Sequence, residues 1–138
     1  MLLLESFIDT LFNWFNDLSP IYTPMKFEEL RVRELSSNLY EKINKIYNKQ
    51  SCKDYFFRDQ ILRATLSISN NIAEWFERET NNELRRFLYI AKGSCWEVRS
   101  MLKISIKTGK ITQEIFDDLH PICTHISVML YKYIQTLT

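Results

Sequence analysis

The sequence predicts an all-α protein, an antiparallel up-down-up-down four-helix bundle with an extra N-terminal amphipathic helix. The 138 residues are 46% apolar and 14% aromatic, which suffices for the core of one domain. Only two glycines and three prolines occur, so long helices with short joints are favoured over a turn-rich β fold. Beyond residue 25, apolar residues recur at helical spacings of three and four in four successive stretches.

Residues 1 to 24 are predicted to form an amphipathic helix followed by a linker. Apolar side chains such as Phe7 and Phe12 fall on one side of this helix, and Glu5, Asp9 and Asp17 fall on the other. An acidic face does not suit an anionic membrane surface, so we expect the helix to dock on protein. One Ser-Pro and one Thr-Pro pair end it, because proline disfavours helix in the residue before it.

Two interpretations of this segment stay open. Met25 begins a plausible bundle sequence, so translation could start there and residues 1 to 24 could be an upstream reading frame. The clean separation of apolar from polar residues favours a real helix, because so many aromatic side chains on one face do not remain in water. We therefore divide the chain into residues 1 to 24 and a bundle domain of residues 25 to 138.

Four helices are expected in the bundle domain. The first runs from about Phe27 to Asn48, the second from about Asp54 to Arg78 and the third from about Asn81 to Lys107. A fourth follows Thr112 and carries apolar residues through Leu137. Because the loops between these long helices have only a few residues, neighbouring helices should be antiparallel.

Local signals mark the ends of these helices. Ser51 is a candidate cap for the second helix, and Thr80 with Glu83 has the form of a capping box for the third. Gly109 suits the position after the third helix. Pro121 lies inside the fourth helix and should kink it, because proline lacks the amide hydrogen of a regular helix.

Composition and cysteine content exclude several classes of protein. All 18 Lys and Arg residues but only 14 of the 17 acidic residues lie beyond residue 24, so the bundle carries +4 and permits nucleic-acid contact without requiring it. Cys52, Cys95 and Cys123 are odd in number and widely spaced, which indicates reduced thiols in a cytoplasm. His120 and His125 do not share a helical face, so we expect no metal site and no cofactor. Charges interrupt the N-terminal apolar residues, so we expect neither a signal peptide nor a membrane span.

The second helix has an unusually wide apolar face. Its apolar residues cover about 200° of the helix circumference at 100° per residue, and a helix that is apolar over more than half its circumference is buried on two sides. We therefore expect it to contact a neighbouring subunit through Leu62, Leu66, Asn70, Asn71 and Ala73. The alternative is a solvated polar strip in which Glu74 pairs with Arg78.

Two stretches carry a resemblance to a known family. Residues 60 to 74 read QILRATLSISNNIAE, and residues 82 to 98 read NELRRFLYIAKGSCWEV. Both resemble the second and third helices of the four-helix-bundle proteins first noticed as open reading frames in intervening sequences of bacterial 23S ribosomal RNA genes. The resemblance spans about Met25 to Leu130.

The resemblance implies a bundle that assembles into a ring-like homopentamer and has no settled biochemical activity. A related branch, the accessory variability determinant proteins of diversity-generating retroelements, works with a reverse transcriptase and contacts nucleic acid. Leu62, Ser69 and Trp75 depart from the family pattern, which has arginine, proline and glycine there. Trp75 in place of glycine should let the second helix continue to Arg78.

The third helix carries a basic stripe that includes two aromatic residues. If this helix continues through residue 110, eight residues fall within an arc of about 80°: Arg85, Tyr89, Lys92, Trp96, Arg99, Lys103, Lys107 and Lys110. Such cations contact a phosphate backbone while exposed aromatic faces stack on bases. Charged residues opposite a core are also ordinary on a bundle helix, and Trp96 could instead contact a neighbouring subunit.

The sequence thus predicts a non-enzymatic cytoplasmic oligomer, a homopentamer, that binds RNA or DNA through this stripe. The alternative is a protein-interaction scaffold, or a retroelement accessory protein that partners a reverse transcriptase without touching nucleic acid. An enzyme is disfavoured because there is no Gly-rich phosphate loop. Ser94 follows Gly93 within a helix rather than at a strand-to-helix elbow, so it does not resemble a hydrolase nucleophile.

Overall fold

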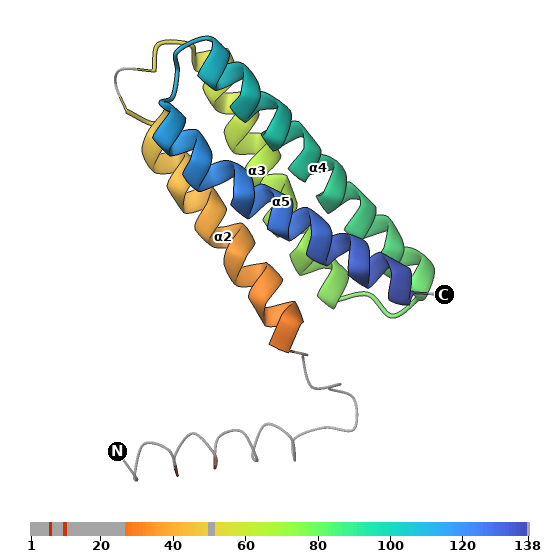
Figure 1. Cartoon of the computed structure of the whole chain (residues 1–138). Coiled ribbons are helices and arrows are strands. Elements are labelled where there is room, and N and C mark those ends of the chain that lie inside the picture. The colour runs from red at the N-terminus through yellow and green to blue at the C-terminus, as the bar shows by residue number, and fades with distance from the viewer. Residues whose placement is uncertain (1–5, 7–9, 11–26, 50–51, 138) are drawn as a thin grey trace. The chain divides into compact units, whose positions relative to one another are not determined.

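The computed structural model describes residues 27 to 49 and 52 to 137, together with Ser6 and Thr10. In this part of the chain there are four α-helices and no strand: α2 (Phe27–Tyr47), α3 (Tyr55–Phe76), α4 (Asn81–Lys107) and α5 (Gln113–Thr136) (Figure 1). Arg31–Thr138 forms one compact unit, the bundle. The predicted all-α class and the four helices are therefore confirmed. Apart from Ser6 and Thr10, the predicted N-terminal helix lies outside the described residues, as does Ser51.

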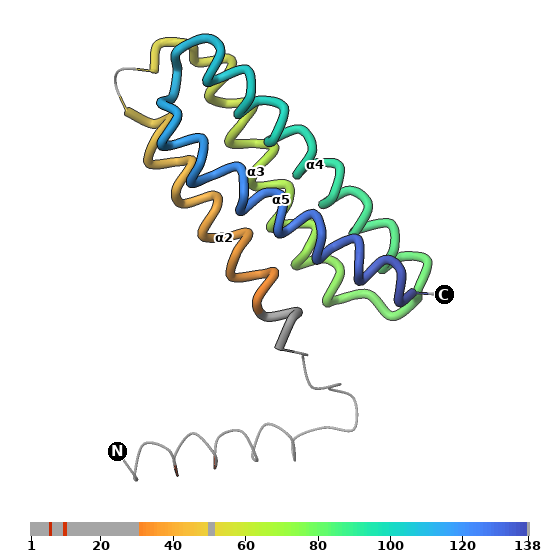
Figure 2. The backbone as a smooth tube through the Cα atoms, in the orientation of Figure 1, coloured from red at the N-terminus to blue at the C-terminus, as the bar shows by residue number. Residues whose placement is uncertain are grey.

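Successive helices run in opposite directions around the bundle, as the tube in Figure 2 shows. α4 packs against both α3 and α5. α2 closes the bundle, because Ser69 of α3 donates to Ser36 at 3.2 Å and Lys42 pairs with Asp118 of α5 at 2.9 Å. As a consequence α3 lies diagonally across the core from α5, and α2 lies diagonally across from α4.

Capping side chains fix where α3 and α4 begin. Asp54, and not the predicted Ser51, caps α3, since its carboxylate accepts a hydrogen bond from the amide of Phe57 at 3.0 Å. Thr80 accepts a hydrogen bond from the amide of Glu83 at 3.4 Å, and its hydroxyl donates to the Glu83 carboxylate at 2.9 Å. The predicted N-cap role of Thr80 and its pairing with Glu83 are thus confirmed, although the Glu83 carboxylate is engaged by the Thr80 hydroxyl.

The turn between α4 and α5 needs a left-handed residue, and Gly109 supplies it with a φ of 70°. Thr112 then caps α5 by accepting a hydrogen bond from the amide of Ile115 at 3.3 Å. Both of these predictions are confirmed. Pro121 lies inside α5, and the kink expected there stays a prediction.

α3 ends at Phe76, two residues before the predicted Arg78. The amide of Glu77 bonds to the carbonyls of Glu74 and Trp75, which tightens the last turn and stops the helix. Trp75 is only 6% exposed, and its ring centre lies 4.9 Å from that of Tyr133 in α5. The tryptophan that replaces the family's glycine therefore fills the core and does not extend the helix to Arg78.

The core runs along the bundle axis, and all four helices contribute aliphatic side chains to it. Residues spaced three and four apart put one face of each helix inside. The largest side chains with less than 2% exposure are Val32, Leu39, Ile43, Tyr47, Ile61, Ile68, Ile72, Leu88, Leu102, Leu119, Ile126 and Leu130.

The stretch of serine and asparagine residues in α3 joins this helix to α4. The hydroxyls of Ser67 and Ser94 lie 2.9 Å apart. The side-chain amide of Asn71 donates to the carbonyl and the hydroxyl of Ser67 at 2.8 and 3.1 Å. These polar groups therefore satisfy one another within the chain, and the small serine side chains allow the two helices to approach closely.

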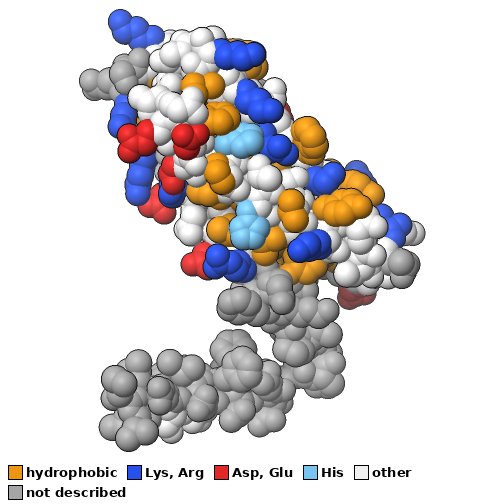
Figure 3. Space-filling model, in the orientation of Figure 1, with side chains coloured by type: hydrophobic (Ala, Val, Ile, Leu, Met, Phe, Trp, Pro, Cys, Tyr) orange, Lys and Arg blue, Asp and Glu red, His pale blue; other side chains and the backbone are white. Residues whose placement is uncertain are grey.

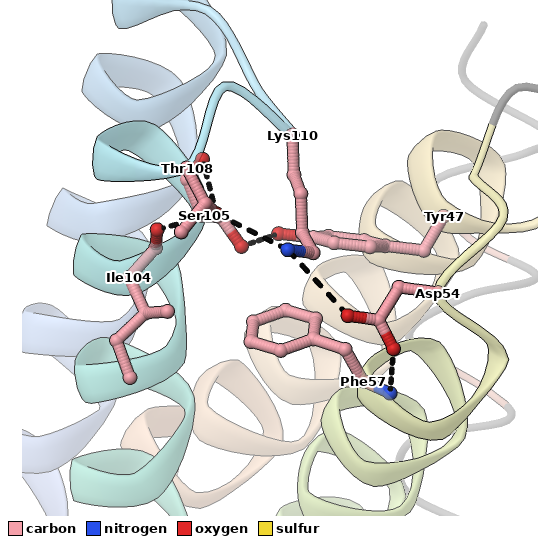
Figure 4. Close-up of polar contacts among 7 residues, drawn as sticks. All are labelled: Tyr47, Asp54, Phe57, Ile104, Ser105, Thr108 and Lys110. Carbon is pink, nitrogen blue, oxygen red and sulfur yellow. Dashed lines mark hydrogen bonds and ion pairs between the residues drawn. The ribbon is translucent and has the colours of Figure 1, made fainter.

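A second polar cluster ties α2, α3 and α4 together at the end of the bundle where the α4–α5 turn lies (Figure 4). The buried hydroxyls of Tyr47 and Ser105 lie 2.6 Å apart. Lys110 extends across the same end, where its ammonium lies 3.6 Å from the carboxylate of Asp54 and 4.9 Å from the centre of the Phe57 ring. The cluster fixes the position of the turn relative to the start of α3.

Candidate nucleic-acid interface

The outer side of α4 presents cations and aromatic rings to solvent. Tyr89 and Trp96 are 54% and 57% exposed, unusually high values for large rings. α4 is continuous from Asn81 to Lys107, so the stripe predicted for it shares one face up to the last residue of the helix. The exposed or half-buried cations on this face are Arg85, Lys92, Arg99, Lys103 and Lys107.

Lys110 does not belong to this face, contrary to the sequence prediction. That prediction required helix through residue 110, but α4 ends at Lys107 and the left-handed Gly109 redirects the chain. Lys110 instead pairs with Asp54 and lies over Phe57 (Figure 4). Its ammonium stabilises the turn between α4 and α5. The stripe therefore has five cations and not six.

α5 adds a second row of side chains beside the stripe. The ammonium of Lys92 lies 5.7 Å from the ring centre of Tyr131, and the charges of Arg99 and Lys103 act on His120. Lys92 comes before Lys103 in α4, whereas Tyr131 comes after His120 in α5, as antiparallel neighbours require. The α5 residues along this line are spaced four, four and three apart: His120, Thr124, Val128 and Tyr131.

We call these four residues, together with the seven residues of the α4 stripe, the α4–α5 face. Figure 3 shows Lys and Arg side chains interleaved with apolar ones there, and carboxylates that gather toward α2. α5 has no Asp or Glu after Asp118, which Lys42 engages. Glu97 of α4 points toward α3, where it accepts a hydrogen bond from Gln60 at 2.7 Å. The face therefore has a positive potential that attracts polyanions.

Arg99 and His120 lie at the junction of the two rows. The Arg99 guanidinium stands 4.9 Å from the centre of the Trp96 ring, and the His120 ring stacks on Phe116 at 4.9 Å. Within the described part of the chain, neither Arg99 Nε nor His120 Nε2 has a hydrogen-bond partner, although both atoms are buried. Burial, with the charges of Arg99 and Lys103, lowers the pKa of His120, so its imidazole is neutral near pH 7.

A gap in the row of α4 side chains separates the two exposed rings. Tyr89, Gly93 and Trp96 follow one another at spacings of four and three, so they lie along one line of the helix. A Cβ placed on Gly93 would meet nothing within 4 Å. At a rise of 1.5 Å per residue, the two aromatic residues are about 10 Å apart along the axis. Gly93 therefore leaves one side-chain position between the two rings unfilled, beside Lys92.

Four of the five residues predicted for a subunit interface lie on the outer side of α3. Leu66 is 42% exposed, Asn70 and Ala73 are exposed, and Leu62 is half-buried. Asn71 is the exception: it is half-buried, and its side-chain NH2 donates to Ser67 of the same helix rather than pointing outward.

The ion pair between Glu74 and Arg78, expected if this side of α3 is a solvated polar strip, is present at the C-terminal end of the helix. Arg78 donates to the carboxylate of Glu74 at 2.6 Å, and its guanidinium lies 5.0 Å from the ring centre of Phe87 in α4. The outer side of α3 is therefore polar at its C-terminal end and apolar around Leu66.

Sequence reasoning missed the contribution of α5. Periodicity assigns faces to one helix at a time, and it does not state which helix lies beside α4 or in which register. The available signal was the line from His120 to Tyr131, which holds His120, Thr124 and Tyr131 in a helix whose opposite side is strongly apolar. These α5 residues can be assigned to the same surface as the α4 stripe only once Lys92 is known to contact Tyr131.

Comparison with known proteins places the chain in a family. Residues 28–132 match the model of a family described as 23S rRNA-intervening sequence protein. The chain belongs to this family. The match begins at the second residue of α2 and continues into the last turns of α5, so the whole α4–α5 face lies within the matched part of the chain.

A solved structure supports the fold of this 23S rRNA-intervening sequence protein. It is the crystal structure of a protein of unknown function from the S23 ribosomal protein family of Bacteroides thetaiotaomicron. It matches with a TM-score of 0.75 and 24% identity, over 79% of this chain and 99% of that chain. No curated protein matches the sequence. At this level of identity the likeness concerns the fold alone.

The described residues contain no group of three or more His, Cys, Asp or Glu side chains arranged to hold a metal ion. None of α2 to α5 is both long and apolar enough to cross a membrane.

Proposed function

We propose that this protein binds single-stranded nucleic acid through the α4–α5 face, without strong sequence preference and without catalysis. The observation that carries the proposal is the combination of five cations with three exposed rings, Tyr89, Trp96 and Tyr131, on one continuous surface. Cations neutralise the phosphate backbone, and exposed rings stack on unpaired bases. The association of the family with intervening sequences of 23S rRNA makes single-stranded RNA the first ligand to test.

The exposed rings indicate more than the electrostatic attraction that any basic helix has for a polyanion. Tyr131 is 51% exposed while Lys92 stands over its ring, so a cation and a stacking surface occur together. The same arrangement recurs further along α4, where Trp96 lies one turn after Lys92 and Arg99 lies two turns after it. Duplexes hide their base faces, so these rings favour single strands over double strands.

The salt dependence of binding tests the proposal. Fluorescence anisotropy with a labelled oligouridylate should show affinity falling steeply as salt rises from about 50 to 200 mM, because phosphate contacts release counterions. Replacement of Lys92, Lys103 and Lys107 by alanine should reduce the slope of log affinity against log salt by about 2, since each single-strand contact contributes about 0.7.

The matched control removes the same charge elsewhere. Lys49, Lys53 and Arg63 are exposed and lie on or beside α2 and α3, so their triple alanine variant should keep the wild-type slope. Equal slopes in the two triple variants would show that net charge, and not the α4–α5 face, governs binding. An oligodeoxyuridylate and a duplex of equal length in the same assay distinguish RNA from DNA and single strands from double strands.

We infer in addition that the chain self-associates through the outer side of α3, as a homopentamer in accord with the family resemblance. The support is Leu66, which is 42% exposed, with Leu62 and Ala73 beside it on the surface diagonally opposite α5. Because a cyclic ring joins two different patches of each subunit, α3 supplies one of them, and nucleic-acid binding requires that the α4–α5 face is not the other. Absence of oligonucleotide binding at low salt, with partners retained in a nuclease-treated pulldown, would favour the protein-scaffold alternative.

A further inference from the structure

The α4–α5 face contains one point where three nitrogen-bearing side chains converge without a counter-charge. Arg99 and Lys103 belong to α4, and His120 belongs to α5. Arg99 Nε and His120 Nε2 are buried and have no hydrogen-bond partner within the described residues. Buried polar atoms are normally paired, so two unpaired nitrogens beside the Lys103 ammonium indicate a place where an external acceptor can bind.

The groups around His120 supply no such acceptor. On α4 they are the two cations, Arg99 and Lys103. On α2 the charged residue at this level is Lys42, whose ammonium is engaged by Asp118, two positions before His120. α3 lies diagonally across the core from α5. On α5 itself Asp117 lies one turn before His120 and accepts a hydrogen bond from Gln113 at 2.9 Å. The His120 ring meets Phe116, and its backbone carbonyl accepts a hydrogen bond from the hydroxyl of Thr124 at 3.1 Å.

We propose that Arg99, Lys103 and His120 together hold one phosphate group of the bound nucleic acid, and that His120 takes up a proton when they do. The proposal rests on the function proposed above and identifies the one contact of that surface that is sensitive to pH. A phosphate oxygen accepts hydrogen bonds from Arg99 Nε and His120 Nε2 at once, and Lys103 adds a third positive charge. His120 is partly exposed, and holding the phosphate requires its ring to turn so that the buried Nε2 reaches the surface.

Proton uptake follows from the change in charge around the imidazole. In the free protein, burial and two cations disfavour the imidazolium and lower the pKa of His120. A bound phosphate neutralises those cations and accepts a hydrogen bond from the ring, so it raises this pKa. Linkage is reciprocal, and the protein therefore binds phosphate more tightly as pH falls through the raised pKa. The gain levels off below the pKa of the free protein.

Histidine proton resonances recorded against pH test the cluster without nucleic acid. Sulfate is the probe, because it is a tetrahedral dianion whose charge is constant in this range, and chloride at equal ionic strength is the reference. The pKa of His120 should be higher in sulfate than in chloride. A His125→Gln variant assigns the two signals. Equal His120 values in the two salts would overturn the proposal.

Oligonucleotide binding at two pH values provides the second readout. The wild type should bind oligouridylate about threefold to tenfold more tightly near pH 6 than near pH 8, since a shift of one pKa unit corresponds to a factor of about ten. His120→Gln should lose this dependence and keep the salt slope, whereas His125→Gln should retain both. A pH dependence that survives in His120→Gln would overturn the proposal and leave the binding function intact. If no oligonucleotide binds at any pH, the binding function fails, and the sulfate titration alone decides about the cluster.

Discussion

Among single residues, Trp96 bears most directly on the proposed function. It is 57% exposed and touches Arg99, so it contributes little to the core. Trp96→Ala should weaken oligouridylate binding by about 1–3 kcal/mol, the usual effect of removing one base-stacking ring. Its free energy of unfolding should change by less than about 0.5 kcal/mol, as for other surface positions. Anisotropy titration and urea denaturation measure the two quantities.

Phe56 is the matched control for this substitution. It is the most exposed large apolar residue of the described chain, at 84%, and it lies in the first turn of α3, away from the α4–α5 face. Phe56→Ala should leave affinity unchanged. An equal loss in both variants would mean that the oligonucleotide contacts exposed rings without regard to their place in the fold.

The three cysteines should differ sharply in reactivity. Cys95 and Cys123 are 0% exposed, and burial raises the pKa of Cys123 to about 12 and raises that of Cys95 as well. Thiolates are the reactive form, so a colorimetric thiol reagent near pH 8 should modify only the half-buried Cys52 in the native protein. It should modify all three after denaturation. Rapid reaction of native Cys52→Ser would contradict the burial of the other two.

The same thiols make stability depend on alkaline pH. Their pKa values are raised in the folded state, so their contribution is complete below the ordinary thiol pKa of about 9 and is lost as pH rises toward the folded-state values. The free energy of unfolding should therefore decline between about pH 9 and pH 11, with Tyr47 adding to the decline above pH 10 because burial raises its pKa too. Urea denaturation at each pH measures this trend. A constant value across the range would contradict it.

At the scale of elements, α4 contains one glycine inside the helix and is followed by another in its terminal turn, and the two should respond oppositely to alanine. Gly109 has a φ of 70°, so Gly109→Ala should cost about 1 kcal/mol. Gly93 lies in mid-helix with nothing within 4 Å of an added Cβ, so Gly93→Ala should stabilise the fold by about 0.5–1 kcal/mol. Thermal and urea denaturation report both changes.

Gly93→Ala also tests the gap between Tyr89 and Trp96. If a base enters there, the added methyl group narrows the gap, and affinity for oligouridylate should fall even though the helix becomes more stable. Opposite changes in stability and affinity cannot come from loss of folding. A variant that is both more stable and fully active would show that no base occupies the gap.

The bounds of these elements were predictable because they depend on local chemistry. Thr80 with Glu83, Gly109 and Thr112 define helix ends through hydrogen bonds to their nearest neighbours in sequence. Lys110 was placed wrongly because one left-handed residue before it changes the direction of the chain. The pairing of Lys92 with Tyr131 could not be predicted, since it depends on which helix lies beside α4 and in which register.

For the whole molecule, substitutions on the outer side of α3 should affect assembly, and substitutions on the α4–α5 face should affect nucleic-acid binding. Leu66 on α3 and Val128 on α5 are 42% and 46% exposed, and their helices are diagonally opposed. Leu66→Glu, with Leu62→Glu, should dissociate an assembly of about five 16.6 kDa chains, because unpaired charge buried at an interface is costly. Val128→Glu should preserve the assembly and weaken oligouridylate binding. Multi-angle light scattering measures the mass.

Two results would contradict this division of the surface. A wild-type mass of 16.6 kDa at micromolar concentration would exclude self-association. Dissociation by Val128→Glu but not by Leu66→Glu would place the subunit contact on the α4–α5 face, so that the rings of Trp96 and Tyr131 would be buried between chains and closed to nucleic acid.

Photochemical crosslinking locates the bound strand on the protein and so distinguishes the α4–α5 face from the other surfaces. Oligouridylate containing 4-thiouridine is bound at low salt, irradiated and digested, and the modified peptides are identified by mass spectrometry. If the strand binds the α4–α5 face, crosslinks should form at Tyr89, Trp96 and Tyr131 and should be lost when salt is raised before irradiation. Crosslinks concentrated at Tyr55 and Phe56 of α3, or crosslinks unaffected by salt, would contradict binding at this face.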